Sequence, residues 1–368
     1  MSAISFFLEL IKISVGAELK FKENPSVTDW QSIFELAQCQ TVLGVLYEGI
    51  QRLPSEQRPP KSVLLQWFMF TENLKSINSK LNRQAVEIIQ HLNDLGYESC
   101  ILKGQGIATY YPNPASRTPG DIDVWIQGDA DNVIKLFSSM KDIDDITYLH
   151  INYHFFPDTE VEVHYRPSFF NNPFFNRRAQ VYFNQSFKEQ CHNKVSLSHG
   201  KVSMPTAEFN RFYILQHIYR HLFGEGIGMR QLMDYYYVLK QGGDATSKEN
   251  TLNMFRQTGM MNFVGATMWI MKEIFGLEDK FLICPPNRQN GEFLLKEVIL
   301  SGNFGHYDKR ICRIQNDQFV FRVFQSFKRN LRFLYIYPQE VLFDIPFRTF
   351  NFFYRMRKKR LVKSEGLS

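Results

Sequence analysis

In the part of the chain before Tyr97, apolar residues recur every three or four positions, which is the period of an α-helix. The clearest example is the segment 79–95, in which the apolar positions are Leu81, Ala85, Ile88, Leu92 and Leu95. Gly96 follows this segment and is a typical helix end. Because proline-rich links at residues 53–55 and 58–60 separate the helical patterns, we expect residues 1–96 to form an N-terminal helical region.

The period changes at Tyr97, after which short stretches alternate between apolar and polar residues. The pattern predicts, in order, a strand at 99–102, a helix at 104–111, a strand at 122–126, a helix at 131–140 and strands at 150–156 and 161–165. The last two strands flank Pro157-Asp158-Thr159-Glu160, a sequence typical of a hairpin turn. Residues 97–205 are therefore expected to form an α/β core with a mixed sheet.

Helical spacing returns at Thr206, a predicted N-cap. The expected buried face of this helix consists of Phe209, Phe212, Leu215, Tyr219 and Leu222, and Gly224 is its expected end. A second helix is predicted at 229–240, and the prolines at 285–286, 338 and 346 are expected to interrupt later helices. We expect a C-terminal helical domain at 206–345 and a basic aromatic tail at 346–368. The predicted fold is α+β, with a central mixed β-sheet flanked by N-terminal and C-terminal helical regions.

The composition narrows the class of protein. Of the 368 residues, 44% are hydrophobic and 22% are charged, which excludes a disordered and a collagen-like chain. The five cysteines are scattered, odd in number and never in a C-x-x-C pair, which argues against a disulfide framework and a zinc knuckle. Cys191-His192 is the only adjacent Cys/His pair, and the lack of a second pair weighs against a metal site there.

Two features of the chain bear on its location. The apolar patch at residues 4–8 is interrupted by Glu9 and Lys12, and no segment has the roughly 18 apolar residues of a membrane span, so we expect a cytoplasmic protein. Basic residues interleaved with Phe and Tyr crowd the segment 309–363. This stretch is either a solvated helix with a basic end, or a surface for nucleic acid or for an anionic membrane, at whose periphery the protein would then lie.

Candidate chemistry lies on two predicted strands. Asp121 and Asp123 are two residues apart, so their side chains leave the same face of one strand. Two adjacent carboxylates repel each other unless a divalent cation such as Mg²⁺ or Mn²⁺ lies between them. Glu162 and His164 likewise share a face of the strand at 161–165. If the two strands are neighbours, Glu162 becomes a third carboxylate, and two ions can be held as in two-metal phosphoryl transfer.

The junction Ile101-Leu102-Lys103-Gly104 supplies groups that suit phosphates. Glycine lets backbone amides approach an anion, a following helix N-terminus favours negative charge, and Lys103 adds a positive charge. Arg117, four residues before Asp121, has a planar guanidinium that can clamp the same phosphates. The lysine-glycine turn, the arginine and the carboxylates together indicate a site for a phosphorylated substrate.

This order of motifs resembles the uncharacterised bacterial nucleotidyltransferase family of the DNA polymerase β-like superfamily. That family has an L-L-K-G turn, an R-x-x-x-D-[IL]-D-[LV] strand and an acidic-h-H strand. The matching residues here are Ile101-Leu102-Lys103-Gly104, Arg117-Thr118-Pro119-Gly120-Asp121-Ile122-Asp123-Val124 and Glu162-Val163-His164. The helical segments 216–221 and 230–234 are also similar, and the resemblance covers roughly residues 34–237. The chain differs from the wider superfamily at Lys103-Gly104, where Gly-Ser or Gly-Gly is usual, and at Glu162, where Asp is common.

The resemblance implies that Asp121, Asp123 and Glu162 are the catalytic residues and hold two Mg²⁺ or Mn²⁺ ions. The nucleotide- and phosphate-binding residues that we predict are Lys103, Gly104, Arg117, His164, His217 and Asp234. His217 and His221 share a helix face, but Ile218 stands where a zinc protease needs Glu, which weighs against zinc. His217, His221, Arg230 and Asp234 form a polar seam that either joins two helices or faces the nucleotide.

The predicted activity is transfer of a nucleoside monophosphate from an NTP to an acceptor hydroxyl, with release of pyrophosphate. The acceptor is left open between a sugar or other small molecule, a protein side chain and RNA. Two alternatives use the same residues: a metal-dependent phosphodiesterase or nuclease, and a non-catalytic nucleotide-binding module.

Overall fold

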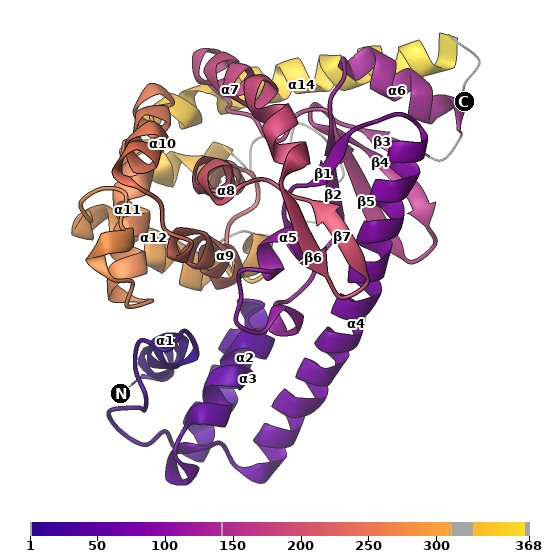
Figure 1. Ribbon diagram of the computed structural model, residues 1–368. Coiled ribbons are helices and arrows are strands. Elements are labelled where there is room, and N and C mark those ends of the chain that lie inside the picture. Colours follow the sequence, from indigo (N-terminus) through magenta and orange to yellow (C-terminus); the bar gives the residue numbers. More distant parts are fainter. Residues whose placement is uncertain (1, 141–142, 309, 311–326, 365–368) are drawn as a thin grey trace.

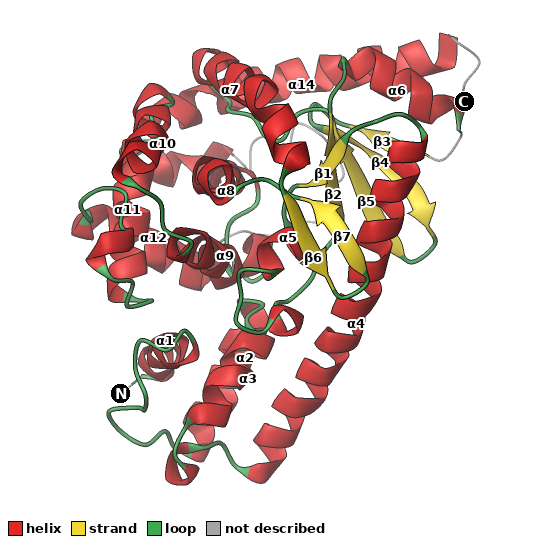
Figure 2. Cartoon of the chain, viewed as in Figure 1, coloured by secondary structure: helices red, strands yellow, loops and turns green. Residues whose placement is uncertain are grey.

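The protein is described by a computed structural model that covers residues 2–140, 143–308, 310 and 327–364 (Figure 1). One sheet occupies the upper right of the view, and helices surround it and extend to the left and below (Figure 2). The predicted α+β class with a central mixed sheet and flanking helices is confirmed. Cys312 and the basic residues within 311–326 lie outside the described residues.

The first third of the chain is helical, as expected. Its helices are α1 (Ala3–Ser14), α2 (Val27–Cys39), α3 (Leu43–Arg52) and α4 (Lys61–Asp94), with a short 3-10 turn at Ser55–Gln57. The helix expected from residue 79 begins at Lys61, because Pro60 immediately precedes it and no proline or glycine interrupts the chain before Gly96. The C-terminal half of α4 packs its buried apolar residues against the sheet, so this helix links the two parts of the fold.

The sheet has five strands in the order β1-β2-β5-β4-β3. Their bounds are β1 Ser99–Ile101, β2 Ile122–Ile126, β3 Ile143–Ile146, β4 His150–Phe156 and β5 Thr159–His164. β2 and β5 run parallel and the other neighbours are antiparallel, which makes the sheet mixed. The hairpin of β4 and β5 turns at Pro157 and Asp158, so Thr159 and Glu160 belong to β5 rather than to the expected four-residue turn.

Each central strand divides its side chains between two environments. Ile122, Val124, Val161 and Val163 face α4 and α6 (Ala130–Ser139) in one hydrophobic cluster. The residues between them therefore point to the opposite face of the sheet. In the parallel register Asp123 lies opposite Glu162, which places two of the predicted carboxylates side by side.

Two structural features between residues 166 and 205 have no counterpart in the sequence prediction. These are the helix α7 (Pro173–His192) and a two-stranded sheet of β6 (Lys194–Leu197) and β7 (Gly200–Ser203). The edge strand β3 was also missed. Helix α5 (Gly104–Ala108) is shorter than predicted and continues only as turns to Tyr111.

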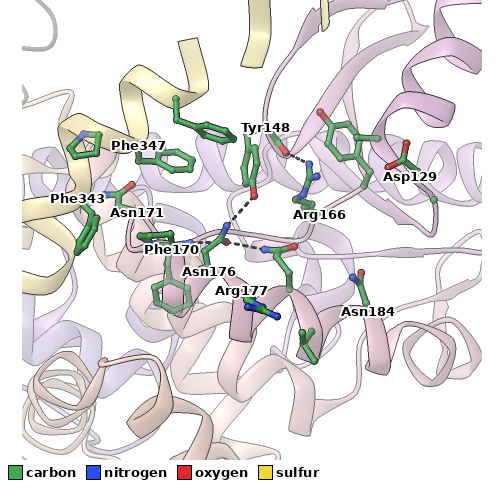
Figure 3. Close-up of a pocket in the computed structure, with 18 residues that line it drawn as sticks. Asp129, Tyr148, Arg166, Phe170, Asn171, Asn176, Arg177, Asn184, Phe343 and Phe347 are labelled. Atoms are coloured by element: carbon green, nitrogen blue, oxygen red, sulfur yellow. Dashed lines mark hydrogen bonds between the residues drawn. The ribbon is translucent and has the colours of Figure 1, made fainter. Parts of the chain in front are cut away.

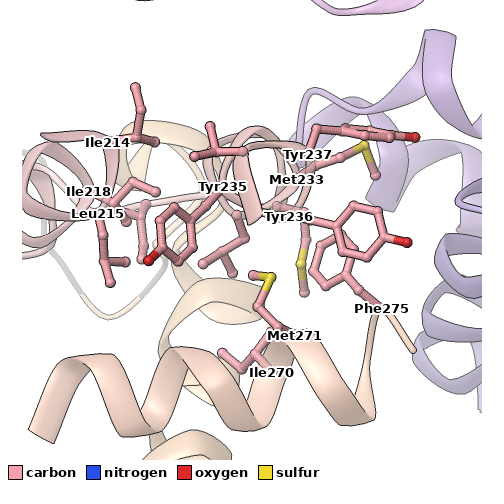
Figure 4. Packing of buried hydrophobic residues seen from close by; sticks show 14 of the residues in the cluster. Ile214, Leu215, Ile218, Met233, Tyr235, Tyr236, Tyr237, Ile270, Met271 and Phe275 are labelled. Carbon is pink, nitrogen blue, oxygen red and sulfur yellow. The ribbon is translucent and has the colours of Figure 1, made fainter. Parts of the chain in front are cut away.

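The C-terminal helices begin where the sequence predicts. Helix α8 (Ala207–Gly224) starts at Thr206, whose Oγ1 accepts a hydrogen bond of 3.3 Å from Phe209 N, and α9 (Met229–Lys240) has the predicted bounds. Both helices are buried on nearly every side rather than along one stripe, because α8 and α9 pack on each other and on α11 (Met261–Glu273) through apolar, aromatic and sulfur side chains (Figure 4). The remaining helices here are α10 (Ala245–Gln257) and α12 (Arg288–Ser301).

The helices at the two ends of the chain share one hydrophobic core. Residues of α1 and α3 belong to the same buried cluster as residues of α8, α9 and α11. Gln40 joins the two sets directly, because its Nε2 donates to Val298 O at 3.1 Å and its Oε1 accepts from Met229 N at 2.9 Å. The N-terminal and C-terminal helical regions are therefore neighbours in space, although the sheet separates them in sequence.

Helix α14 (Pro338–Ser364) closes the described chain and packs on α6 and β3. The expected interruption at Pro346 is wrong, and the boundary predicted at residue 346 falls inside this helix. A proline leaves one carbonyl of the preceding turn unpaired. That carbonyl belongs to Leu342, an exposed residue of the helix. No helix in the described part of the chain has the length and apolar content needed to cross a membrane.

Candidate functional site

Three carboxylates meet on the face of the sheet opposite α4. Asp123 lies on β2, Glu162 lies opposite it on β5, and Asp121 immediately precedes β2. One oxygen from each of these side chains lies within 4.8 Å of the others, and the set has the composition of a metal site. Hard divalent cations such as Mg²⁺ favour oxygen ligands of this kind.

The charge of these carboxylates is only partly compensated within the protein. Repulsion from Asp123, together with burial, raises the pKa of Asp121 to about 6. Burial also favours a protonated Asp123, but the Lys103 ammonium 2.8 Å away and a hydrogen bond from His164 hold its pKa below the usual value. The residues present therefore fit a bound cation, because Asp121 has acidic neighbours and too little positive charge beside it.

His164, on β5, links two of the acids. Its Nε2 lies 2.9 Å from Asp123 Oδ1 and 3.0 Å from Glu162 Oε2, and its Nδ1 lies 3.2 Å from Arg166 O. Carboxylate and carbonyl oxygens only accept hydrogen bonds, so both ring nitrogens must donate and the ring is an imidazolium. Burial opposes this charge, but the two acids outweigh it and raise the pKa of His164 to about 9.

His150 is a residue of this site that the sequence reasoning missed. It begins β4 opposite His164, and its Nδ1 lies 3.0 Å from Glu162 Oε2 without the geometry of a hydrogen bond. His150, Glu162 and His164 form a second group with metal-ligand composition. The signal in the sequence was the hairpin register, which pairs the first residue of one strand with the last residue of the next.

The predicted phosphate loop lies beside the carboxylates. Lys103 points at Asp123, and the acids raise its pKa although burial alone would lower it. Gly104 has φ +50°, in the left-handed region that favours glycine, and a Cβ there would lie 3.5 Å from Asp121 O. The sequence needs glycine here because the chain turns sharply next to the carboxylates. The roles of Lys103 and Gly104 in phosphate binding stay predictions.

Arg117 and Asp234 bind each other. Arg117 Nε and Nη2 donate to the two carboxylate oxygens of Asp234 at 2.7 and 2.8 Å, and Tyr111 Oη donates to the same carboxylate at 2.6 Å. This pairing raises the pKa of Arg117 against the effect of burial. Both side chains line the cavity, but each is occupied by the other, and their predicted contacts with phosphate stay predictions.

Two further arginines line the cavity without an acidic partner. Arg220 on α8 and Arg230 on α9 both border the cavity of about 270 Å³ that contains the three carboxylates, which we call the carboxylate cavity. Arg220 Nη2 lies 2.8 Å from His221 Nε2, and Arg230 Nη1 donates to Thr118 O and Pro119 O at 3.3 and 3.4 Å. Within the described residues no carboxylate lies within ion-pair distance of either guanidinium, and both Nε atoms are buried without a hydrogen-bond partner. Burial lowers the pKa of both, yet an arginine stays charged near neutral pH. Asp234 and Asp121 attract Arg230, and Glu225 and Glu162 attract Arg220, from beyond ion-pair distance, so the cavity holds positive and negative charges that only partly offset each other.

The polar seam predicted on α8 and α9 faces this cavity. His217, His221, Arg230 and Asp234 all line it, while Asp234 bonds to Arg117 in the loop before β2 and not to the histidines of α8. Burial and the neighbouring Lys103 lower the pKa of His217, and burial and Arg220 lower that of His221 to about 4, so both rings are neutral. Neither histidine belongs to a metal-ligand group among the described residues.

Comparison with known proteins adds a family. The sequence profile of an uncharacterised nucleotidyltransferase family matches residues 26–276, more than half of the chain. Comparison with curated proteins finds no match. Among solved structures, an antigenic nucleotidyltransferase-like protein from Paracoccidioides brasiliensis is similar at 15% identity and a TM-score of 0.30, over 52% of this chain and 91% of its own. A TM-score of 0.30 is too low to relate the two structures.

Proposed function

We propose that this chain, which belongs to the uncharacterised nucleotidyltransferase family, transfers a nucleoside monophosphate from an NTP to an acceptor hydroxyl. Family membership supports a transferase. The observation that carries the finer proposal is the carboxylate cavity, which combines three acids with Lys103, Arg220 and Arg230. This mixture of charges suits a metal-bound triphosphate, because carboxylates bind its cations and arginines bind its phosphate oxygens.

In this proposal Asp121, Asp123 and Glu162 hold Mg²⁺ or Mn²⁺. Two such ions, when bound, neutralise charge on the triphosphate and lower the pKa of the attacking hydroxyl. The side chains of the cavity have separate tasks. Lys103 and Arg230 bind phosphate oxygens, and His164 fixes the positions of Asp123 and Glu162 through its two hydrogen bonds.

The reaction is an in-line displacement at the α-phosphorus. The acceptor oxygen bonds to that phosphorus, and the bond from the phosphorus to the oxygen that bridges to the β-phosphate breaks with its electron pair. Pyrophosphate leaves, and the hydroxyl proton passes to solvent. Arg230 would stabilise the charge that develops on the leaving group, since it lines the carboxylate cavity and its guanidinium is already held by Thr118 O and Pro119 O.

The test is the fate of the label in a cell extract supplemented with the protein and Mg²⁺. With each NTP labelled at the α-phosphate, label should appear on an acceptor, and with the γ-phosphate labelled it should appear in pyrophosphate. Transfer of γ-label to an acceptor would identify a kinase instead. Cleavage of phosphodiesters without use of NTP would favour the phosphodiesterase or nuclease alternative. NTP binding without either product would favour a non-catalytic module.

The bacterial origin of the protein and its cytoplasmic or membrane-peripheral location stay predictions. The same holds for the division of the chain into regions after residues 96, 205 and 345, and for binding of nucleic acid or an anionic membrane by the basic tail. In the structure Lys358 is buried and forms an ion pair with Asp131, and Arg355 pairs with Asp145 at 2.7 Å. Part of the basic charge is therefore used within the protein.

A further inference from the structure

A second cavity adjoins the carboxylate cavity. It has a volume of about 300 Å³ and lies between the β3–β4 turn, the C-terminal end of α8 and α14. We call it the connecting cavity. Four residues line both cavities: His150, Arg220, His221 and Glu225. Since His150 Nδ1 lies 3.0 Å from Glu162 Oε2, the connecting cavity begins one side chain away from the third carboxylate.

The residues suited to the triphosphate border only the first of these cavities. Lys103, Gly104, Asp121 and Arg230 line the carboxylate cavity and not the connecting cavity. A nucleotide held by these groups leaves the side at His150 and Arg220 open to a second substrate. An acceptor must reach the α-phosphorus from a direction that the triphosphate does not occupy, because attack is in line with the leaving group.

The lining of the connecting cavity combines hydrogen-bond donors, hydrogen-bond acceptors and aromatic rings. Arg220 Nε, a donor, and Asn351 Oδ1, an acceptor, are buried there without hydrogen-bond partners in the described part of the chain. Phe169 and Phe347 stack with ring centroids 4.3 Å apart in its wall. Hydroxyl groups both donate and accept, so a ligand rich in hydroxyls suits a cavity whose lining combines guanidinium, amide and carboxylate groups.

A third and larger cavity continues beyond this wall (Figure 3). It has a volume of about 830 Å³ and shares Tyr148, Asn171 and Phe347 with the connecting cavity, so we call it the aromatic cavity. Its lining combines aromatic rings with amides and arginines: Tyr148, Tyr165, Phe170, Phe347, Asn176, Gln180 and Arg166. Asn176 Nδ2 donates to Tyr148 Oη at 3.0 Å, which fixes this ring between the two cavities.

We propose that the connecting cavity binds the acceptor and that the acceptor is a carbohydrate. The inference rests on the proposed nucleotidyl transfer. A sugar presents hydroxyls to amides, arginines and acids, and its C–H face packs on aromatic rings, which is the mixture of groups that lines both cavities. A sugar hydroxyl beside Glu162 then bonds to the α-phosphorus, pyrophosphate leaves, and the proton passes to solvent.

The same lining argues against nucleic acid and against a lipid as the acceptor. Nucleic acid requires a row of cations for its phosphates, whereas Arg348 in the connecting cavity is already paired with Asp344 at 2.8 Å. An acyl chain requires a lining without unpaired polar groups, whereas Arg220 and Asn351 each leave one such atom buried here.

The first experiment identifies the acceptor class. A cell extract is separated into protein, RNA, lipid and carbohydrate fractions, and each is incubated with the protein, Mg²⁺ and α-labelled NTPs. Label should enter the carbohydrate fraction, and mass spectrometry should show a sugar plus a nucleoside monophosphate. Label in the protein, RNA or lipid fraction alone would overturn the inference and leave the proposed transfer intact. If no fraction becomes labelled, the proposed function itself fails.

The second experiment locates the acceptor with the labelled carbohydrate from the first. Gly224 lines the connecting cavity and not the carboxylate cavity, and a Cβ there would meet no atom within 4 Å, so Gly224→Leu adds bulk at the border of the connecting cavity. We expect the KM for the acceptor to rise roughly tenfold or more, as for loss of about 1.4 kcal/mol. The Kd for NTP should stay within about twofold, and Gly224→Ala is the matched control.

A second variant keeps this test decisive if Gly224→Leu does not fold. Asn351→Leu removes the unpaired amide at similar size and should also raise the KM for the acceptor, whereas Asn253→Leu on the exposed side of α10 should not. An unchanged acceptor KM in both Gly224→Leu and Asn351→Leu would show that the acceptor binds elsewhere.

Discussion

The carboxylate cavity holds two kinds of arginine. Arg117, which is buried, is paired through two hydrogen bonds with Asp234, which Tyr111 also contacts. Arg230 lies beside it, since both guanidiniums donate to Thr118 O, but neither Arg230 nor Arg220 has a carboxylate within ion-pair distance in the described part of the chain. A paired buried charge joins parts of a fold, whereas one without an acidic partner is better suited to a bound anion. We therefore interpret Arg117 as a link within the fold and propose Arg230 as a group for phosphate; contacts of either with a ligand stay predictions.

The carboxylates divide in the same way. Asp123 has Lys103 and His164 as partners, whereas Asp121 has a raised pKa next to another acid. The three acids nevertheless lie close enough for a shared cation. Substitutions that remove a paired group and an unpaired group should consequently differ in their effect on stability and on ligand binding.

The largest effect is expected at the carboxylates. Asp121→Asn and Asp123→Asn should each reduce transfer by at least roughly 100-fold, because the charge that holds the cation is lost. In the absence of metal, Asp121→Asn should raise the melting temperature, since it relieves repulsion, whereas Asp123→Asn should lower it, since Lys103 loses its partner. Rates with labelled NTP and thermal unfolding without metal are the measurements. Asp94→Asn on exposed helix surface is the control, and equal effects of all three variants would contradict the account.

The next largest difference is expected between substitutions of Arg117 and Arg230. Arg117→Met leaves Asp234 buried without its cation, and we expect a loss of about 3–5 kcal/mol in the free energy of unfolding. Arg230→Met should leave that free energy unchanged or higher and weaken NTP binding by roughly 10- to 100-fold, as for a lost charged hydrogen bond of about 1.5–3 kcal/mol. Urea unfolding and calorimetric NTP titration distinguish the two. A large loss of stability in Arg230→Met with normal NTP affinity would reverse the assignment.

Glu340 is a buried carboxyl group outside the cavity. Its Oε2 accepts a hydrogen bond from Asn171 N at 2.8 Å, and burial raises its pKa to about 8. The folded protein therefore holds a proton that the unfolded chain releases between about pH 4.5 and 8, so this group makes stability fall as pH rises through that window and no further above it. Its contribution to the slope is about 1.4 kcal/mol per pH unit.

Glu340→Gln should remove that contribution, so the variant should gain stability relative to the parent as pH rises from 5 to 8. Urea unfolding at several pH values measures the difference, and Glu273→Gln at an exposed position is the control. NTP affinity should not change, because Glu340 does not line the carboxylate cavity. A constant difference between variant and parent across this range would refute the proposed titration.

The smallest effect is expected at the end of α14. Removal of residues 355–368 deletes the ion pairs of Arg355 with Asp145 and of Lys358 with Asp131, and partly exposed pairs contribute about 1 kcal/mol or less each. The fold should persist with a slightly lower melting temperature. Binding to anionic vesicles and to RNA at low salt, compared with the full chain, tests the tail itself. Absence of binding by the full chain would rule out both partners for the tail.

The strands that carry the motifs could be predicted from the sequence, because apolar and polar residues alternate along them and short turns bound them. Asp121 and Asp123 flank a residue of the buried face, and a short turn sets the pairing of β4 with β5. By contrast, Arg220 and Arg230 lie on helices, where basic residues are usually solvated, and only the packing of α8 and α9 beside the sheet encloses them. Helix α7 was missed because its buried residues are few among many polar ones.

The most direct test of the central claim is the position of the cation. Crystals grown with Mn²⁺ and a non-hydrolysable NTP analogue give anomalous scattering from the metal. The account predicts a peak within roughly 2.2 Å of oxygens from Asp121 and Asp123, with the triphosphate against Arg230. A peak held by other residues, or a triphosphate bound outside the carboxylate cavity, would contradict it.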